Sequence, residues 1–208
     1  MENTQKITEI REWLGTGSIN IFGRPFAGKD THGRELEALL DGVLLGGGDI
    51  LRNSTVPEHV KDCLREGKLI PTDDYIEIVL PYLSQDKFAQ KPLILSSVGR
   101  WHGEEDGVLD ATQEAGHPIQ AVIYLNVDEA TIRERWHLST HLNDRGGRDD
   151  DTEEVLEIRL HEYREKTLPV IDYYKNNGLL IDVDGTLDKH IVLNNIIDAL
   201  HNLATATH

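Results

Sequence analysis

Apolar and amphipathic segments alternate along the chain, and their order predicts a sheet flanked by helices. Short apolar runs have the length and composition of buried strands at residues 18–22, 92–98, 120–127 and 179–185. Between these runs, apolar residues recur at helical spacing. Strands that alternate with helices indicate a parallel sheet, so we expect an α/β fold in a single domain, residues 1–208.

The predicted helices differ in length and in how they end. A short amphipathic helix at 5–14 precedes the first strand, which makes residues 1–17 an N-terminal extension of the core. The segment 31–42 has leucines at helical spacing and would end at Gly42. Three consecutive glycines, 46–48, would allow a sharp turn or a close backbone approach. Further helices are predicted at 56–67, at 72–85 with an interruption at Pro81, at 128–138, at 151–178 with an interruption at Pro169, and at 189–203.

The composition of the chain limits which ligands and which cellular compartment we expect. The 208 residues carry a formal net charge of −16, which argues against binding to nucleic acid or to an acidic membrane, because both need a basic face. This net charge is compatible with binding of a small anionic ligand, since a few arginines can create a local positive region. The single cysteine, Cys63, excludes an internal disulfide and fits a reducing compartment. With no long apolar stretch and no signal-peptide core, we expect a cytoplasmic monomer.

The segment 23–31, GRPFAGKDT, joins the first predicted strand to a helix and has the spacing of a phosphate-binding loop. In such a G-x-x-x-x-G-K loop, backbone N–H groups surround phosphate oxygens and the lysine neutralises the β- and γ-phosphates. Gly23, Gly28 and Lys29 occupy these positions. The alternative is a glycine turn between strand and helix that contains a lysine by chance. In the usual loop a serine or threonine follows the lysine directly, whereas here Asp30 lies between Lys29 and Thr31.

This G-K-x-T order resembles that of adenylate kinases and other nucleoside monophosphate kinases, whose loop typically reads G-x-P-G-x-G-K-G-T. Further family motifs follow in the same order, and the resemblance extends over about residues 18–200. The matching segments are GGGDILRNS (46–54), EGKLIPTDD (66–74), SSVGR (96–100), GGRDDDTEEVLEIRLHEYREKTLPVIDYY (146–174) and DVDGT (182–186). Several motifs in register are far more specific than one loop.

The resemblance implies an architecture, ligands and a cofactor. We expect a P-loop NTPase-type sheet of five parallel strands, a monophosphate-binding insert at about 46–75 and a short lid at about 137–150. The implied partners are ATP and a nucleoside monophosphate, with Mg²⁺ accompanying ATP and AMP as the default acceptor. Structural zinc is not expected, because the cysteines of zinc-binding relatives are absent and the pair His137 and His141 lacks a third ligand.

The resemblance also implies roles for individual residues. The expected ATP-binding residues are Gly23, Arg24, Pro25, Phe26, Ala27, Gly28, Lys29, Asp30, Thr31 and Arg135. The expected monophosphate-binding residues are Gly47, Arg52, Lys68, Leu69, Ile70, Arg100 and Glu104. Lys29, Arg100, Arg148 and Arg159 are expected to act in catalysis. Cations suit this chemistry, because the transition state spreads negative charge over phosphate oxygens and arginine holds phosphate bidentately.

One departure from the family motifs concerns the metal. The family's D-G-F-P-R aspartate, which helps organise the water shell of Mg²⁺, is replaced by Ser96, while an aspartate is present at Asp30. We hypothesise that the metal-organising carboxylate has moved to Asp30 and acts through water. Alternatively, Asp30 is a helix N-terminal residue that points to solvent and is stabilised by the helix dipole.

A second departure concerns the base of the acceptor. The family's threonine before G-D-x-L-R is Gly47, and its glutamine corresponds to Glu104. A glutamine amide donates and accepts, whereas a carboxylate only accepts, which suits guanine or the amino group of cytosine. Alternatively, the segment around Glu104 is solvated and out of register. Trp101 and Trp136 are expected to pack in the core rather than to stack on a base.

Three functions are compatible with these motifs. A nucleoside monophosphate kinase, by default an adenylate kinase, accounts for cations on both the acceptor and the transferring phosphate. A nucleotide-binding regulator with weakened chemistry would account for the substitutions at Phe26, Gly47 and Ser96. A P-loop kinase for a small metabolite is the third, although segments 46–54 and 66–74 favour a nucleotide acceptor.

Overall fold

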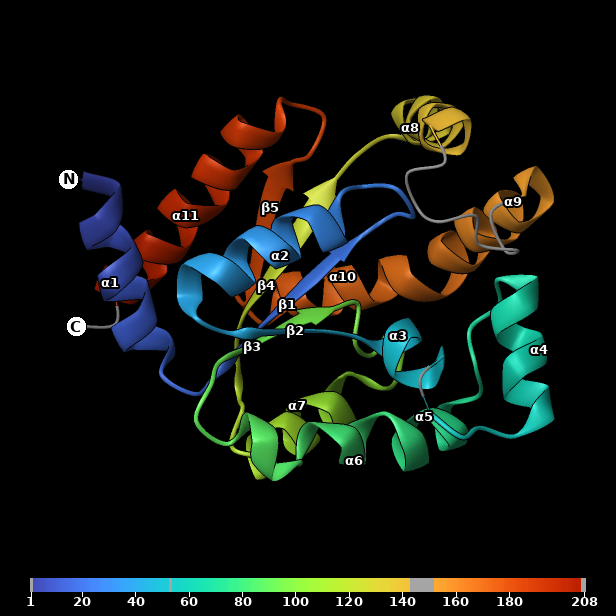
Figure 1. Ribbon diagram of the computed structural model, residues 1–208, viewed down its shortest axis with the longest axis horizontal. Helices are drawn as coiled ribbons and strands as arrows, with labels where there is room; N and C mark the ends of the chain where they lie inside the picture. The colour runs from blue at the N-terminus through green and yellow to red at the C-terminus, as the bar shows by residue number, and fades with distance from the viewer. Residues whose placement is uncertain (1, 53, 143–151, 207–208) are drawn as a thin grey trace.

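The computed structural model describes residues 2–52, 54–142 and 152–206, and these form a sheet between two layers of helices (Figure 1). The sheet has five parallel strands in the order β2-β3-β1-β4-β5. The strands are β1 (Ser18–Gly23), β2 (Val43–Gly46), β3 (Leu93–Ser96), β4 (Ile119–Asn126) and β5 (Leu180–Asp184). The expected parallel five-stranded α/β fold is therefore confirmed.

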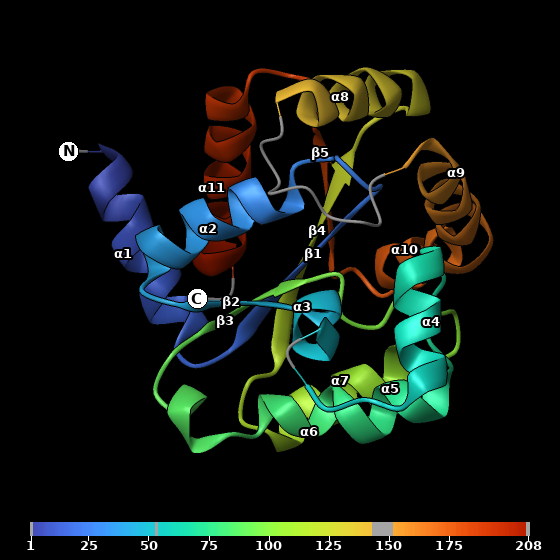
Figure 2. The same ribbon diagram turned by 45° about the vertical axis from the view of Figure 1, so that its right-hand side comes forward.

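Three helices cover one face of the sheet. They are α1 (Glu2–Leu14), α2 (Lys29–Leu40) and α11 (Lys189–Ala206). Ile19 and Ile21 point to this side from the central strand and belong to one buried cluster with Leu36 of α2 and Ile196 of α11. The helices α1 and α11 pack side by side, as both views show (Figures 1 and 2). The predicted N-terminal helix is thus part of the core packing.

The opposite face is covered by helices from the middle of the chain and by one from its last third. They are α5 (Thr72–Ile78), α6 (Leu80–Leu83), α7 (Glu105–Glu114) and α10 (Leu168–Asn176). Phe22 and Val122 point to this side and share a buried cluster with Val79, Val108 and Tyr174. The helices around the carboxyl ends of the strands are α3 (Gly47–Arg52), α4 (Glu58–Glu66), α8 (Glu129–Leu142) and α9 (Glu153–Glu162), as Figures 1 and 2 show.

Some local predictions were wrong or incomplete. The helix α2 ends one residue before Asp41, whose φ is 51°, so Asp41 rather than Gly42 takes the left-handed conformation that terminates it. The glycines 46–48 form no sharp turn, because they end β2 and begin α3. The sequence pattern identified neither β2, which has only four residues, nor α7, whose apolar positions are few. The break near Pro169 is a π-helical turn at Tyr163–Thr167.

Within the described parts of the chain, no helix is long and apolar enough to cross a membrane. The expected lid at 137–150 lies largely outside the described residues, and its first part is the end of α8, which continues to Leu142. The expected acceptor insert at 46–75 comprises α3, α4 and the start of α5.

Candidate active site

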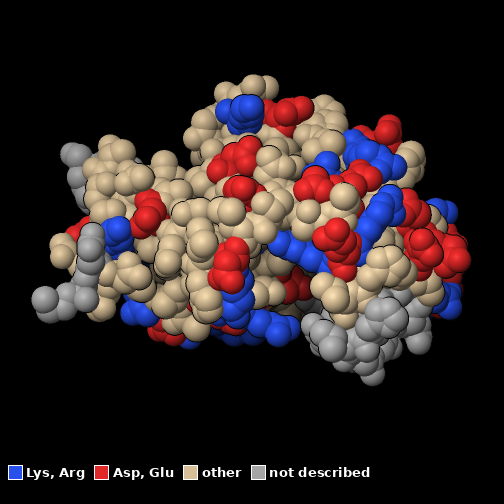
Figure 3. Space-filling view, turned by 90° about the horizontal axis from the view of Figure 1, so that it is seen from above, with Lys and Arg blue, Asp and Glu red and all other residues tan. Residues whose placement is uncertain are grey.

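A cavity of about 590 Å³ opens where the carboxyl ends of β1, β2 and β3 meet. Its walls come from the loop after β1, the insert, the segment after β3, and helices α8 and α9. The central strand β1 lies between β3 and β4, and ligands of open α/β sheets bind in the crevice outside the strand ends at such a point. Acidic and basic side chains are interspersed on the face seen in Figure 3.

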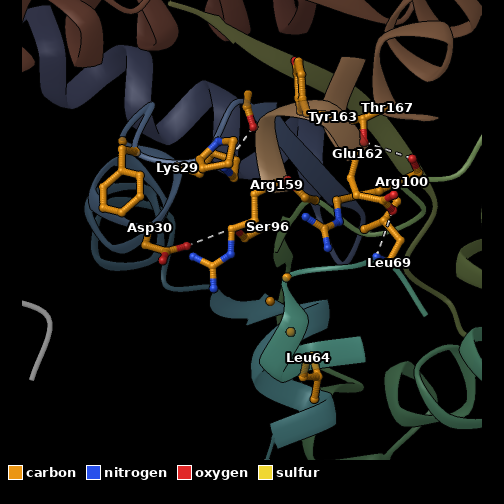
Figure 4. Close-up of a pocket in the computed structure, with 18 of the residues that line it drawn as sticks. Lys29, Asp30, Leu64, Leu69, Ser96, Arg100, Arg159, Glu162, Tyr163 and Thr167 are labelled. Carbon is orange, nitrogen blue, oxygen red and sulfur yellow. Dashed lines mark hydrogen bonds between the residues drawn. The ribbon is translucent and has the colours of Figure 1, made fainter. Parts of the chain in front are cut away.

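The loop after β1 is folded as a phosphate cradle. Gly28 precedes α2 with a left-handed φ of 99°, and a Cβ at Gly23 would lie 3.0 Å from the carbonyl oxygen of Leu125. Lys29 Nζ donates to the carbonyl oxygens of Gly23 and Arg24, both at 2.9 Å, which holds the ammonium at the loop (Figure 4). Phe26 has a φ of 61°, a conformation that costs a non-glycine residue about 1–2 kcal/mol.

Both expected ATP-binding arginines are anchored to the backbone. Arg135 Nη2 donates to the carbonyl oxygen of Gly185 at 2.7 Å, and this side chain lines the cavity. Arg24 Nη1 donates to the carbonyl oxygen of Val127 at 2.9 Å, and its guanidinium lies over the ring of Tyr163. Arg24 therefore ties the loop to the end of β4 instead of lining the cavity.

Asp30 and Ser96 lie in contact at the strand edge, although they are 66 positions apart. Ser96 Oγ donates to Asp30 Oδ1 at 3.0 Å, and both residues line the cavity beside Lys29 and Thr31 (Figure 4). The Asp30 carboxylate is thus adjacent to the place where the family's aspartate is missing. Asp30 also lies in the first turn of α2 and is exposed, so the contact with Ser96 and the position at the helix N-terminus are both present.

A group of cations faces the same cavity from several elements. They are Arg52 at the end of α3, Lys68 after α4, Arg100 after β3 and Arg159 on α9. Although part of the Arg100 residue is exposed, partial loss of hydration around its guanidinium lowers its pKa, and the like charge of Arg159 adds to the lowering. The two guanidinium groups point into one region in Figure 4. Their repulsion would be relieved by an anion between them.

A narrower recess continues from the cavity beneath the insert. Its walls include Gly47, Leu69, Ile70, Tyr75, Trp101 and Glu104. Glu104 is only 7% exposed, and its Oε2 accepts a hydrogen bond from the Trp101 backbone N–H at 3.2 Å. The alternative of a solvated segment around Glu104 is therefore wrong. Trp136 packs in the core as expected, whereas Trp101 is half-buried and lines the recess, so the core prediction for Trp101 is wrong.

Sequence patterns did not identify Glu162, which joins the insert to α9. Its Oε2 accepts from the Leu69 backbone N–H at 3.1 Å and from Lys166 Nζ at 2.6 Å, and it lines the cavity near Arg100 (Figure 4). The available signal was its position one helical turn after Arg159, which places both on one face of α9.

Arg148 and most of the lid lie outside the described residues. Among the residues that are described, no three His, Cys, Asp or Glu side chains gather into a metal-binding group.

Comparisons with known proteins agree with this geometry. The protein-family model described as adenylate kinase matches residues 21–179. An adenylate kinase of Cyanothece sp. is 31% identical over 86% of this chain and 94% of its own length. One of Prochlorococcus marinus is 32% identical over 86% and 95%. A gluconokinase from Sinorhizobium meliloti superposes with a TM-score of 0.63 over 92% of this chain and 95% of its own, at 16% identity, which supports the fold alone.

Proposed function

The chain belongs to the adenylate kinase family, and from this premise we propose that it transfers the γ-phosphoryl group of ATP to a nucleoside monophosphate. Family membership makes it a phosphotransferase. The observation that carries the proposal is one cavity lined both by the phosphate loop and by Arg52, Arg100 and Arg159 from three other elements. AMP is the first acceptor to test, because the relatives are named adenylate kinases.

ATP would bind with its β- and γ-phosphates in the loop at Gly23–Thr31. The Lys29 ammonium would leave the carbonyl oxygens of Gly23 and Arg24 and pair with phosphate oxygens. Arg135, held by Gly185, would lie on the donor side with a fixed orientation. The dipole at the start of α2 adds a favourable field for the same anion.

The acceptor phosphate would bind between Arg52 and Arg100, with Lys68 nearby and the base in the recess beyond. Arg100 and Arg159 would then stabilise the charge that develops on the transferring group, a role also proposed for Arg148. An ionised phosphate is already a nucleophile, so no strong general base is needed. Catalysis would rest on in-line positioning and on charge neutralisation.

Members of this family generally use Mg²⁺ together with ATP, and we propose that Asp30 supports the ion through water. The residues fit such a role. Ser96 fixes one oxygen of the Asp30 carboxylate, which leaves the other free to accept from a water. Mg²⁺ usually keeps several waters and binds through one or two carboxylates plus substrate phosphates, so a large protein cage is not required. The bound ion would neutralise charge on the phosphates.

Phosphoryl transfer tests the function directly. Labelled AMP and the other four common monophosphates are incubated with Mg·ATP, and the diphosphates formed are separated by chromatography. Transfer to one or more acceptors supports the proposal, and Lys29→Met should abolish it in a protein that still folds. If the chain binds ATP by calorimetry but phosphorylates none of the five, it is a nucleotide-binding regulator or a kinase for another small metabolite instead.

The metal role has its own test, which does not depend on turnover. Calorimetry measures ATP affinity with Mg²⁺ and with EDTA for the wild type and for Asp30→Asn. Second-layer carboxylates typically change metal affinity about 10- to 100-fold, so the gain in affinity from Mg²⁺ should shrink by about tenfold in the variant. An equal gain in both proteins would leave Asp30 without a metal role.

A further inference from the structure

We propose that the Glu104 carboxylate recognises the base of the acceptor by hydrogen bonds and so selects GMP over AMP. This inference rests on the proposed function, because it assumes that a nucleoside monophosphate enters the recess. It departs from the adenine preference that the names of the relatives suggest.

The position of Glu104 is the first support. With 7% of its surface exposed, it lies on the recess wall together with Trp101 and Tyr75, beyond the phosphate-binding position of Arg100. Arg100 lines the same recess, whose volume is about 40 Å³, so a nucleotide whose phosphate reaches Arg100 would have to widen the recess to present its base to Glu104. The hydrogen bond from the Trp101 N–H to Oε2 limits the rotation of the carboxylate, so that it is a fixed acceptor group.

The chemistry of the bases is the second support. An ionised carboxylate has acceptors only. The N1–H and N2–H₂ groups of guanine are two adjacent donors that match its two oxygens. Adenine and cytosine present a ring-nitrogen acceptor beside one amino donor, and that nitrogen would face a carboxylate oxygen. Uracil and thymine present one donor between two carbonyl oxygens. Guanine alone satisfies both oxygens.

The absence of a side chain at Gly47 is the third support. A Cβ there would lie 3.6 Å from Tyr75 Oη and 3.7 Å from the carbonyl oxygen of Ser97, which are ordinary van der Waals distances. The threonine at the corresponding family position would contribute a hydroxyl next to the base, and this chain has none. Recognition of the base would therefore depend on the Glu104 carboxylate.

The protonation state of Glu104 offers a test without mutation. Burial raises the pKa of its carboxyl, and the nearby Glu105 adds to the rise, while Thr72, the Trp101 N–H and Arg100 oppose it. The phenols of Tyr75 and Tyr174 also face this group and stay protonated, because burial raises the pKa of both. A protonated Glu104 would present one donor and one acceptor, as glutamine does, and would accept adenine.

The experiment is a competition between labelled GMP and AMP for limiting Mg·ATP, read as the ratio of labelled GDP to labelled ADP at early times. The proteins are the wild type, the near-isosteric Glu104→Gln, and Glu77→Gln on the exposed side of α5 as the matched control. A hydrogen bond to a charged group changes binding about 10- to 100-fold. We expect the wild type to favour GMP, Glu104→Gln to shift the ratio toward AMP by about that factor, and Glu77→Gln to match the wild type.

The pH dependence should agree with the variants. In the wild type the ratio of GMP to AMP phosphorylation should fall as the pH is lowered, while in Glu104→Gln it should stay constant. Titration of the acceptor phosphates cancels in this ratio. A wild type that favours AMP, or an equal ratio in wild type and Glu104→Gln, overturns the inference and leaves the kinase proposal intact. If no acceptor is phosphorylated, the dissociation constants of GMP and AMP for the same proteins decide the question.

Discussion

Replacing Tyr75 by phenylalanine should destabilise the protein measurably, although the change removes a single oxygen atom. The Gly99 backbone N–H donates to Tyr75 Oη at 2.8 Å, and both residues are buried. Phenylalanine keeps the ring in the cluster that contains Val79 and Leu83 but leaves the Gly99 N–H without its acceptor. The loss therefore concerns one hydrogen bond between α5 and the segment that carries Arg100.

The size of the effect follows from that unsatisfied donor. Leaving a buried N–H unpaired costs about 1–3 kcal/mol, and the removal of a buried hydroxyl offsets part of it. A net loss of about 1–2 kcal/mol corresponds to a fall in Tm of about 2–8 °C for a chain of this length. The KM for the acceptor should also rise, because Gly99 precedes Arg100 in the segment that would bind the acceptor phosphate.

Urea denaturation followed by circular dichroism gives the free energy of unfolding, with Tyr82→Phe as the matched control. The Tyr82 hydroxyl accepts from Lys87 Nζ at 3.1 Å in an exposed hydrogen bond, so its loss should cost less than about 0.5 kcal/mol. Equal stability of the Tyr75 and Tyr82 variants would refute the reasoning, since it would mean that the Gly99 N–H finds another partner at no cost.

Three further variants test other parts of the site. Lys29→Met should lower kcat by at least about 100-fold with little change in Tm, because the lost cation acts on the charge of the phosphates. A phosphoryl-transfer assay measures kcat, and a thermal melting curve measures Tm. Gly67→Ala should lose about 1–3 kcal/mol in urea denaturation, because φ is 72° and the new Cβ would lie 2.9 Å from Val155 Cγ1. Glu104→Gln should raise Tm at pH 8, because burial raises the pKa of the wild-type carboxyl and its charged form is disfavoured in the fold. This advantage should shrink as the pH falls through the raised pKa and vanish below the ordinary value of 4.5, so a constant difference in Tm between pH 4 and 8 would contradict it.

Much of the fold and part of the candidate site follow from local sequence. Strand β1, the loop from Gly23 to Thr31 and helix α2 are consecutive, and their apolar spacing and glycines determine both their conformations and their order. The hydrogen bonds from Lys29 to the loop carbonyls span only five and six residues. Because these contacts lie within one short segment, periodicity and motif spacing were enough to predict the strand, the loop and the helix, although not the carbonyl partners of Lys29.

Contacts between distant segments were decided only by the tertiary structure. The sequence showed that Ser96 stands where the family has an aspartate and that an aspartate is present at Asp30, and the pairing of β1 with β3 brings the exposed Asp30 into contact with Ser96. The sequence also left Glu104 either solvated or facing the acceptor, and its burial depends on the packing of α5 against the segment after β3. The burial and the electrostatic environment of a side chain depend on all its neighbours in space, and many of these lie far away in the sequence. Local pattern supplies the chemical groups, whereas the packing of the sheet and helices decides which of them meet.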